Sequence, residues 1–153
     1  MRKVEIPELT FSDWCWWERR AEIGNIRYPG VYMLAISPID LSGKPVSYDK
    51  VSYIGMTNAQ AGLIGRWEQL NRSIHGKAGH SGGNSIFKKL GNYQTWKGGL
   101  DLYVCAMPVV CNVLAPTEKD LRLMGGVCYM EYEAFSIYKK FVNGSQRPEF
   151  NTR

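Results

Sequence analysis

The sequence predicts an α+β fold, with a small three-stranded, mostly antiparallel sheet flanked by helices. Three segments rich in β-branched and aromatic residues, 29–37, 51–57 and 100–110, are typical of strands. Apolar residues recur at helical spacing in several of the segments between and after them. The chain has 153 residues, 44% of them hydrophobic, which is enough for one packed core. We therefore expect a single domain over residues 1–153.

The first patterned segment, DWCWWERRAEIGN over residues 13–25, carries three tryptophans beside Arg19 and Arg20. We interpret it as part of an N-terminal helical extension at about 8–24 whose aromatic side chains pack onto the domain. Aromatic rings beside arginines can also stack on nucleic-acid bases. Core packing is the interpretation that we favour.

The first two strands are expected to form a hairpin with a long loop. The strand 29–37, PGVYMLAIS, begins at a Pro-Gly pair and is followed by another proline. The connector PIDLSGKPVSYDK over 38–50 is rich in turn-forming residues. The strand 51–57, VSYIGMT, follows directly.

Two helices are predicted in the middle of the chain, separated by a loop. The segment 61–74 has apolar residues at helical spacing: Leu63, Ile64, Trp67, Leu70 and Ile74. The segment 75–84, HGKAGHSGGN, indicates a glycine-rich basic loop. The segment 85–93 indicates a short helix with Asn84 or Ser85 as its cap.

The last part of the chain is predicted to contain a third strand and two more helices. The strand is 100–110, and a helix over 117–125 begins with Thr117 or a neighbour as its cap. A longer helix over 126–142 has one apolar stripe: Met130, Ala134, Ile137 and Phe141. A turn and an extended tail complete the chain over 143–153. The resulting element order is β-β-α-α-β-α-α.

The charge and hydropathy of the chain restrict its class of partner. The formal net charge is +5, which favours an anionic partner, most simply a nucleic acid. No apolar run approaches the roughly 18 residues of a membrane span. The N-terminal segment lacks the apolar core of a signal peptide. A cytoplasmic location without a membrane partner is therefore expected.

The four cysteines, Cys15, Cys105, Cys111 and Cys128, form no CxxC pair. They are expected to be reduced and mostly buried. The two histidines lie far from every cysteine in the sequence, which disfavours a zinc site.

Five residue types that suit phosphodiester chemistry occur in separate elements. Tyr32 and Tyr53 lie on adjacent strands, where both phenols can reach the same face. Arg66 lies at the start of the helix 61–74, a glutamate lies in the last long helix, and Asn151 follows the motif RPEF.

In their order and separations, these residues resemble the GIY-YIG nuclease family. The first motif is Gly30-Val31-Tyr32 and the second is Tyr53-Ile54-Gly55. The helical arginine is in GLIGRWEQL, the glutamate in YMEYEAFSIYKKF and the asparagine in RPEFN. The resemblance covers Gly30 to Asn151. It implies a divalent-metal-dependent DNA endonuclease that hydrolyses phosphodiester bonds.

The resemblance also implies a role for each residue. Tyr32 would be the general base toward water, and Tyr53 would hydrogen-bond in the same network. Arg66 would hold phosphate oxygens through its planar guanidinium. Glu133 would bind one Mg²⁺ or Mn²⁺ ion per active site. Asn151 would brace the centre, and Gly55 would let the backbone turn close to the substrate.

The choice of glutamate has an alternative. Glu131 and Glu133 are two residues apart, so they point in different directions on a helix. Many relatives carry isoleucine or a similar residue four positions after the glutamate. Glu133 has Ile137 there and Glu131 has Phe135. This comparison favours Glu133 and leaves Glu131 as the alternative.

Other residues are candidates for supporting roles. Arg72, Lys77, His80 and Lys88 are candidate nucleic-acid contacts, on or beside the glycine-rich loop. His75 is a further candidate catalytic residue, because Leu70 stands where some restriction-type relatives carry a histidine. The sequence also departs from many relatives at Met56, where they carry a lysine.

The expected substrate is double-stranded DNA. A restriction-type enzyme or a mobile-element or phage nuclease fits the free-standing domain, and a nuclease toxin is an alternative. Cutting both strands with one centre per chain calls for a homodimer or two successive nicks. A non-catalytic nucleic-acid-binding module on the same fold is a second alternative. A ββα-metal nuclease built on His75, His80 and Asn84 is disfavoured, because its first histidine should follow a strand.

Overall fold

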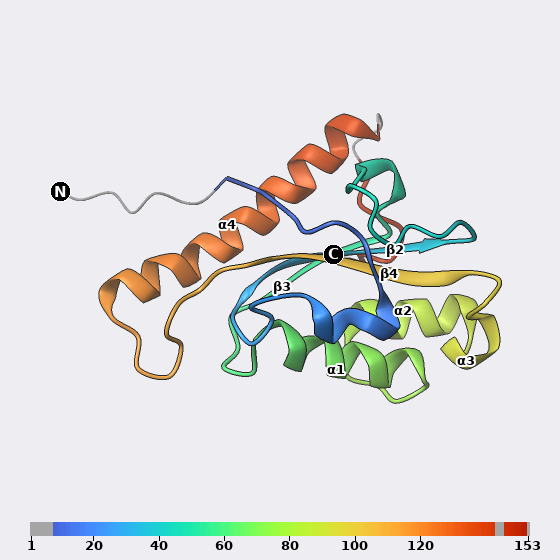
Figure 1. The fold of residues 1–153 in the computed structure, drawn as a ribbon, viewed down its shortest axis with the longest axis horizontal. Helices are drawn as coiled ribbons and strands as arrows, with labels where there is room; N and C mark the ends of the chain where they lie inside the picture. Colours follow the sequence, from blue (N-terminus) through green and yellow to red (C-terminus); the bar gives the residue numbers. More distant parts are fainter. Residues whose placement is uncertain (1–7, 143–145, 153) are drawn as a thin grey trace.

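The structure is a computed structural model that describes residues 8–142 and 146–152. A twisted sheet forms the middle layer, with α4 (Glu118–Phe141) crossing one face and α1 (Gly62–Ile74) and α2 (Ser81–Leu90) on the other (Figure 1). The short helix α3 (Tyr93–Trp96) follows α2. The predicted α+β class is confirmed.

The sheet has four strands among the described residues, so the predicted count of three is wrong. Its order is β1-β4-β2-β3, and every pairing is antiparallel. The strands are β1 (Cys15–Trp16), β2 (Gly30–Ser37), β3 (Tyr53–Thr57) and β4 (Asp101–Pro108). β1 was missed because two residues are too short to display an alternating pattern.

β2 and β3 pair directly, as the predicted hairpin requires. The register sets Tyr32 opposite Gly55 and Leu34 opposite Tyr53. The connector between the strands contains a short 3₁₀ helix, η2 (Tyr48–Lys50).

Alternation along β2 divides the core into two clusters. Val31 and Met33 belong to the cluster with α4, which contributes Met130. Tyr32 and Leu34 belong to the other cluster, together with Trp67 of α1 and Phe150 near the C-terminus. The phenol of Tyr32 is therefore directed away from α4.

α2 begins at Ser81, four residues before the predicted start, so part of the expected loop is helical. The His80 side chain caps this helix, since its Nδ1 accepts a hydrogen bond from the Gly83 amide at 3.0 Å. Glycine is required here by close packing. A Cβ at Gly82 would lie 2.5 Å from the Tyr53 ring, and one at Gly83 would lie 2.6 Å from Ser73 Cβ.

α4 is one continuous helix, where two were predicted. Thr117 and Asp120 form a capping box at its start, which confirms Thr117 as the cap. Gly125 and Gly126 suggested a break between the helices, because glycine costs about 1 kcal/mol in a helix interior. Packing outweighs this cost, since Gly126 and Val127 are buried.

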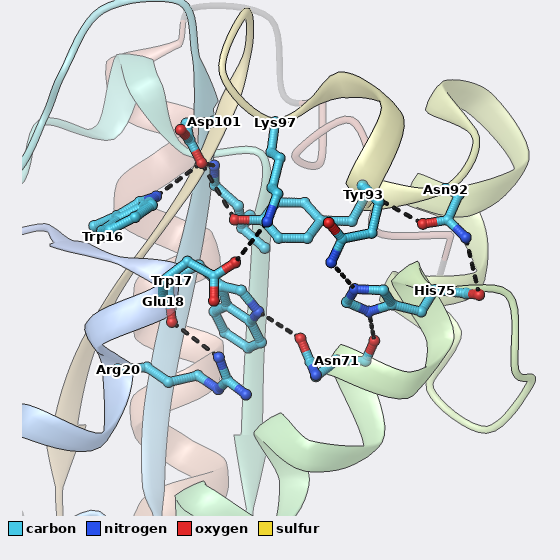
Figure 2. A network of polar contacts seen from close by, with 12 residues as sticks. Trp16, Trp17, Glu18, Arg20, Asn71, His75, Asn92, Tyr93, Lys97 and Asp101 are labelled. Carbon is cyan, nitrogen blue, oxygen red and sulfur yellow. Dashed lines mark hydrogen bonds and ion pairs between the residues drawn. The ribbon is translucent and has the colours of Figure 1, made fainter.

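The N-terminal segment is part of the domain rather than a helical extension. β1 is followed by a 3₁₀ helix, η1 (Trp17–Glu22). Trp14 belongs to the core cluster below α4, and Trp17 to the cluster on the other face. The Trp17 indole donates a hydrogen bond to Asn71 Oδ1 of α1 at 2.9 Å (Figure 2). The predicted core packing of these tryptophans is therefore observed.

All four cysteines are free, and Cys105 and Cys111 are buried. Among residues 8–142 and 146–152, no helix is long and apolar enough to cross a bilayer.

Candidate active site

Tyr32 and Tyr53 lie together on the face of the sheet that α1 and α2 cover. Their ring centroids are 6.1 Å apart, and the edge of Trp67 packs against Tyr32. Tyr32 has no exposed surface, whereas Tyr53 keeps 7% of its own. Burial raises the pKa of the Tyr32 phenol well above its usual range, Tyr53 adds to the rise, and Arg66 opposes it. Tyr32 is therefore neutral at physiological pH.

Gly55 makes room for the two phenols. A Cβ at this position would lie 2.6 Å from the Tyr32 hydroxyl and 2.8 Å from a Tyr53 ring carbon. Gly55 lies within β3, opposite Tyr32 in the β2–β3 pairing. Gly55 was predicted to let the backbone turn close to the substrate. In the structure, its lack of a side chain instead leaves room for the two phenol rings.

His80 is the third ring in this cluster. Its Nε2 lies 2.7 Å from the Tyr32 hydroxyl, and its ring centroid lies 5.5 Å from that of Tyr53. Burial, and then the charge of Arg66, lower the pKa of His80 to about 3, so the imidazole is neutral. Since Nδ1 accepts from the Gly83 amide, the single proton is on Nε2. His80 therefore donates its N–H to the oxygen of Tyr32.

Arg66 lies on α1, whose first residue, Gly62, has a positive φ of 68°. A side chain at Gly62 would lie 2.2 Å from the Arg27 carbonyl oxygen, so only glycine fits. The partly buried Arg66 lowers the pKa values of both Tyr32 and His80, which places its charge beside the pair. Its Nη1 also donates to Gln69 Oε1 at 2.7 Å.

The amides at the start of α1 are already occupied. The Leu63 amide donates to the Tyr28 carbonyl at 3.0 Å, and the Ile64 amide donates to the Ile26 carbonyl at 2.8 Å. Any phosphate near this helix would therefore depend on the Arg66 side chain rather than on these amides.

Asn151 fastens the C-terminal segment to the free edge of β3. Its side-chain oxygen accepts from the Ile54 amide, and its side-chain nitrogen donates to the Ile54 carbonyl, both at 2.9 Å. The Phe150 amide also donates to the Ser52 carbonyl at 3.0 Å. The side chain thus holds the backbone next to Tyr53.

A pocket of about 190 Å³ opens beside this edge. Its lining consists of Tyr53, Ile54, Ser81, Glu131, Phe135, Arg147, Asn151 and Thr152. Glu131 supplies the carboxylate. Burial raises its pKa above the usual range, and the positive charge of Arg147 opposes the rise.

Glu133 lies on a different flank of α4. Its charge raises the pKa values of Tyr48 and Tyr129, and it is absent from the pocket lining. Two residues along a helix correspond to a rotation of about 200°. The pocket therefore favours Glu131 over Glu133 as the candidate metal ligand. The choice of Glu133 depended on Ile137, four positions later, and that residue does not indicate which flank of the helix faces β3.

Glu131 is the one carboxylate among the described residues that line the pocket, and the Arg147 guanidinium lines it too. Mg²⁺ usually keeps several waters and takes one or two carboxylates together with substrate phosphates. Within the described ranges, no group of three or more His, Cys, Asp and Glu side chains could enclose an ion. Glu131 is therefore the candidate metal ligand, and water and phosphate would complete the shell.

The structure does not bring His75 to the tyrosine pair. Its Nδ1 donates to the Asn71 carbonyl at 2.6 Å, and its Nε2 lies 3.2 Å from the Gln94 side-chain nitrogen (Figure 2). The ring also packs edge-on against Tyr93 of α3. Nδ1 is thus engaged at the end of α1, and Nε2 contacts α3.

Of the candidate nucleic-acid contacts, Arg72, Lys77 and Lys88 are exposed. His80 is fully buried, which is incompatible with its expected place on the surface of the loop. Two members of the site were not predicted: His80 as partner of Tyr32, and Arg147. For His80, the available signal was the Gly-Gly pair that follows it, because glycines allow neighbouring segments to pack closely. For Arg147, it was the position four residues before Asn151.

No protein-family model matches the chain, and neither a curated protein nor a solved structure matches it significantly.

Proposed function

We propose that the protein is a divalent-metal-dependent DNA endonuclease of the GIY-YIG class that hydrolyses phosphodiester bonds. The observation that supports this most strongly is the shared pocket of Tyr53, Glu131 and Asn151. Beside it, Tyr32, His80 and Arg66 interact with one another. These side chains come from distant segments of the chain, and together they include a phenol, a cation and a carboxylate suited to phosphodiester hydrolysis.

Arg66 is the proposed phosphate-binding group. Its guanidinium presents a planar fork of donors that matches two phosphate oxygens. The neighbouring rings of Tyr32 and His80 are neutral and buried, so they do not compete for this charge. In the transition state, the guanidinium would stabilise the negative charge that develops on the phosphoryl oxygens.

The two tyrosines have different proposed roles. Tyr32 has no exposed surface, so it acts as a positioning residue that holds His80 and Tyr53 in place. Tyr53 lines the pocket and can accept a hydrogen bond from the attacking water. The Tyr53→Phe variant is expected to cut DNA about 100-fold more slowly, if its phenol serves in proton transfer. Full activity of this variant would remove the role.

Glu131 is the proposed metal ligand. A divalent cation bound there would polarise the phosphate and stabilise the departing oxygen. A half-buried carboxylate favours such a cation, because the ion replaces the solvation that burial removed.

Glu131→Gln and Glu133→Gln provide a matched test. Supercoiled plasmid is incubated with each protein and Mg²⁺ or Mn²⁺, and nicked and linear products are quantified. Glu131→Gln is expected to abolish cutting and to retain DNA binding, whereas Glu133→Gln stays active. The reverse result would return the metal to Glu133. An inert wild type with every metal tested would overturn the proposed activity.

The complete burial of Tyr32 favours a second candidate function, a non-catalytic nucleic-acid-binding module on the same fold. That protein would bind DNA without cutting it, so DNA binding together with an inert wild type supports this candidate. For the enzyme, the proposed role is that of a restriction-type or a mobile-element or phage nuclease.

A further inference from the structure

A second hollow adjoins the candidate active site on the outer side of α4. It encloses about 170 Å³, and its lining consists of Tyr132, Phe135, Ser136, Lys139 and Arg147. Phe135 and Arg147 also line the pocket of Glu131. The two hollows therefore share a wall.

The outer hollow combines aromatic rings with cations. Tyr132 is 69% exposed, and the Arg147 guanidinium lies 5.3 Å from the centroid of the Phe135 ring. Tyr132, Phe135 and Lys139 follow one another at helical spacing, so they form one stripe on α4. No carboxylate is among the described residues that line the hollow. An exposed tyrosine ring in a hollow that is also lined by two cations, Lys139 and Arg147, suits a base and its adjoining phosphate.

We propose that this surface, called the α4 platform and consisting of Tyr132, Phe135, Lys139 and Arg147, binds an unpaired nucleotide of the substrate. The inference rests on the proposed function and narrows its substrate class. Base pairing and stacking within a duplex hide the faces of all but the terminal bases, so a ring stacks most readily on an unpaired base. The preferred substrate is therefore DNA in which a single-stranded segment adjoins the cleaved bond.

The test compares a blunt labelled duplex with the same duplex carrying a single-stranded overhang at either end. Fluorescence anisotropy is measured with EDTA, so that binding occurs without cleavage. Wild-type protein is expected to bind one overhang substrate more tightly than the blunt duplex. Tyr132→Leu should weaken overhang binding by about 5- to 100-fold, because stacking is lost while an apolar side chain remains. Tyr132→Trp should restore it, and blunt-duplex binding should change less than twofold.

Phe141→Ala is the matched control. Phe141 is 70% exposed on the same helix, but it stacks on Tyr48 rather than lining the hollow. Its replacement should leave overhang binding unchanged. A 2-aminopurine base in the overhang gives a direct readout, since stacking on Tyr132 should quench its fluorescence in the wild type and not in Tyr132→Leu.

The outcomes separate this inference from the proposed function. Equal binding of blunt and overhang substrates by a protein that cuts plasmid would overturn the α4 platform and leave the nuclease. An equal loss for both substrates in Tyr132→Leu would also overturn it, as a general duplex contact. A change from dimer to monomer in that variant would assign the surface to a second copy instead. Failure to bind any DNA would overturn both proposals.

Discussion

The imidazole of His80 lies 2.7 Å from the hydroxyl of Tyr32, and both side chains are fully buried. This contact joins β2 to the start of α2 across 48 positions of sequence. Because the imidazole is neutral and its Nδ1 is occupied by the Gly83 amide, the donor is the His80 Nε2–H.

This hydrogen bond predicts energetic coupling between the two residues. Tyr32→Phe leaves the His80 N–H without its acceptor, and His80→Leu removes the matching donor. Each single variant is expected to lose about 1–3 kcal/mol of unfolding free energy. In a double-mutant cycle measured by urea unfolding, the coupling should exceed about 0.5 kcal/mol.

Tyr132→Phe, an exposed substitution on the outer side of α4, is the control for this cycle. Its effect should add to that of His80→Leu within about 0.5 kcal/mol. Strict additivity of Tyr32→Phe and His80→Leu would contradict the hydrogen bond.

The lowered pKa of His80 predicts a loss of stability in mild acid. Its pKa is about 3 in the folded state, against about 6.5 in the unfolded chain. Between these values the unfolded state binds the additional proton. The stabilising contribution is therefore complete above about pH 6.5 and falls toward pH 3, by at most about 1.4 kcal/mol per pH unit.

Urea midpoints measured from pH 7.5 to about pH 4 would test this slope, with His80→Gln as the comparison that cancels other titrating groups. The variant should show a flatter profile than the wild type. Parallel profiles would indicate that His80 is protonated in the folded protein.

Glu131 is expected to lower the stability of the metal-free protein and to allow a bound metal to raise it. Its raised pKa means that the ionised carboxylate destabilises the folded state, fully so above the folded pKa. Without metal at pH 7.5, Glu131→Gln should therefore melt at the same temperature as the wild type or higher. With Mn²⁺ or Mg²⁺ at about 100 times its Kd, the wild type should gain about 5 °C or more.

The metal-dependent gain should be absent in Glu131→Gln and retained in Glu133→Gln. Differential scanning fluorimetry of the three proteins, with and without metal, gives the comparison independently of any DNA. An equal gain in all three would place the ion elsewhere.

Because Gly55 and Gly82 lie close to the two tyrosine rings, we expect that neither position tolerates a larger residue. Gly55→Ala and Gly82→Ala would each place a Cβ within 2.6 Å of a tyrosine ring. Each is expected to cost about 1–3 kcal/mol of unfolding free energy. Gly125→Ala is the control, since nothing lies within 4 Å of its Cβ and a helical alanine should stabilise by up to about 1 kcal/mol. Tolerance of alanine at Gly55 would contradict the observed ring positions.

The two hydrogen bonds of Asn151 to Ile54 predict that the C-terminal segment is needed to keep the candidate active site in place. Asn151→Ala removes both hydrogen bonds to Ile54 and is expected to cost about 1–2 kcal/mol. The C-terminal segment should then become sensitive to carboxypeptidase, and cleavage of DNA should slow. Gln146→Ala, at an exposed position of the same segment outside the pocket lining, should change neither. Wild-type protease resistance in Asn151→Ala would show that Phe150 alone holds the segment.

Much of the fold was predictable because its signals are local. The β-branched and aromatic residues of β2 and β3 and the apolar spacing in α1 each depend on residues within a few positions of one another. The four-residue difference at the start of α2 and the continuity of α4 were not predictable in this way. At Gly82, close packing against the Tyr53 ring outweighs the low helix propensity of glycine, and Gly126 is buried within α4.

The sequence by itself indicated that Tyr32 and Tyr53 can reach one face of the sheet, because side chains alternate along paired strands with a period of two, and the register of β2 and β3 places them there. It also determined that Glu131 and Glu133 point to different flanks of one helix. Only the tertiary structure decided that Glu131 faces the pocket and that His80, rather than His75, contacts a tyrosine. The rotation of α4 about its axis and the path of the loop before α2 are set by packing against residues far away in the chain, and neither leaves a local pattern.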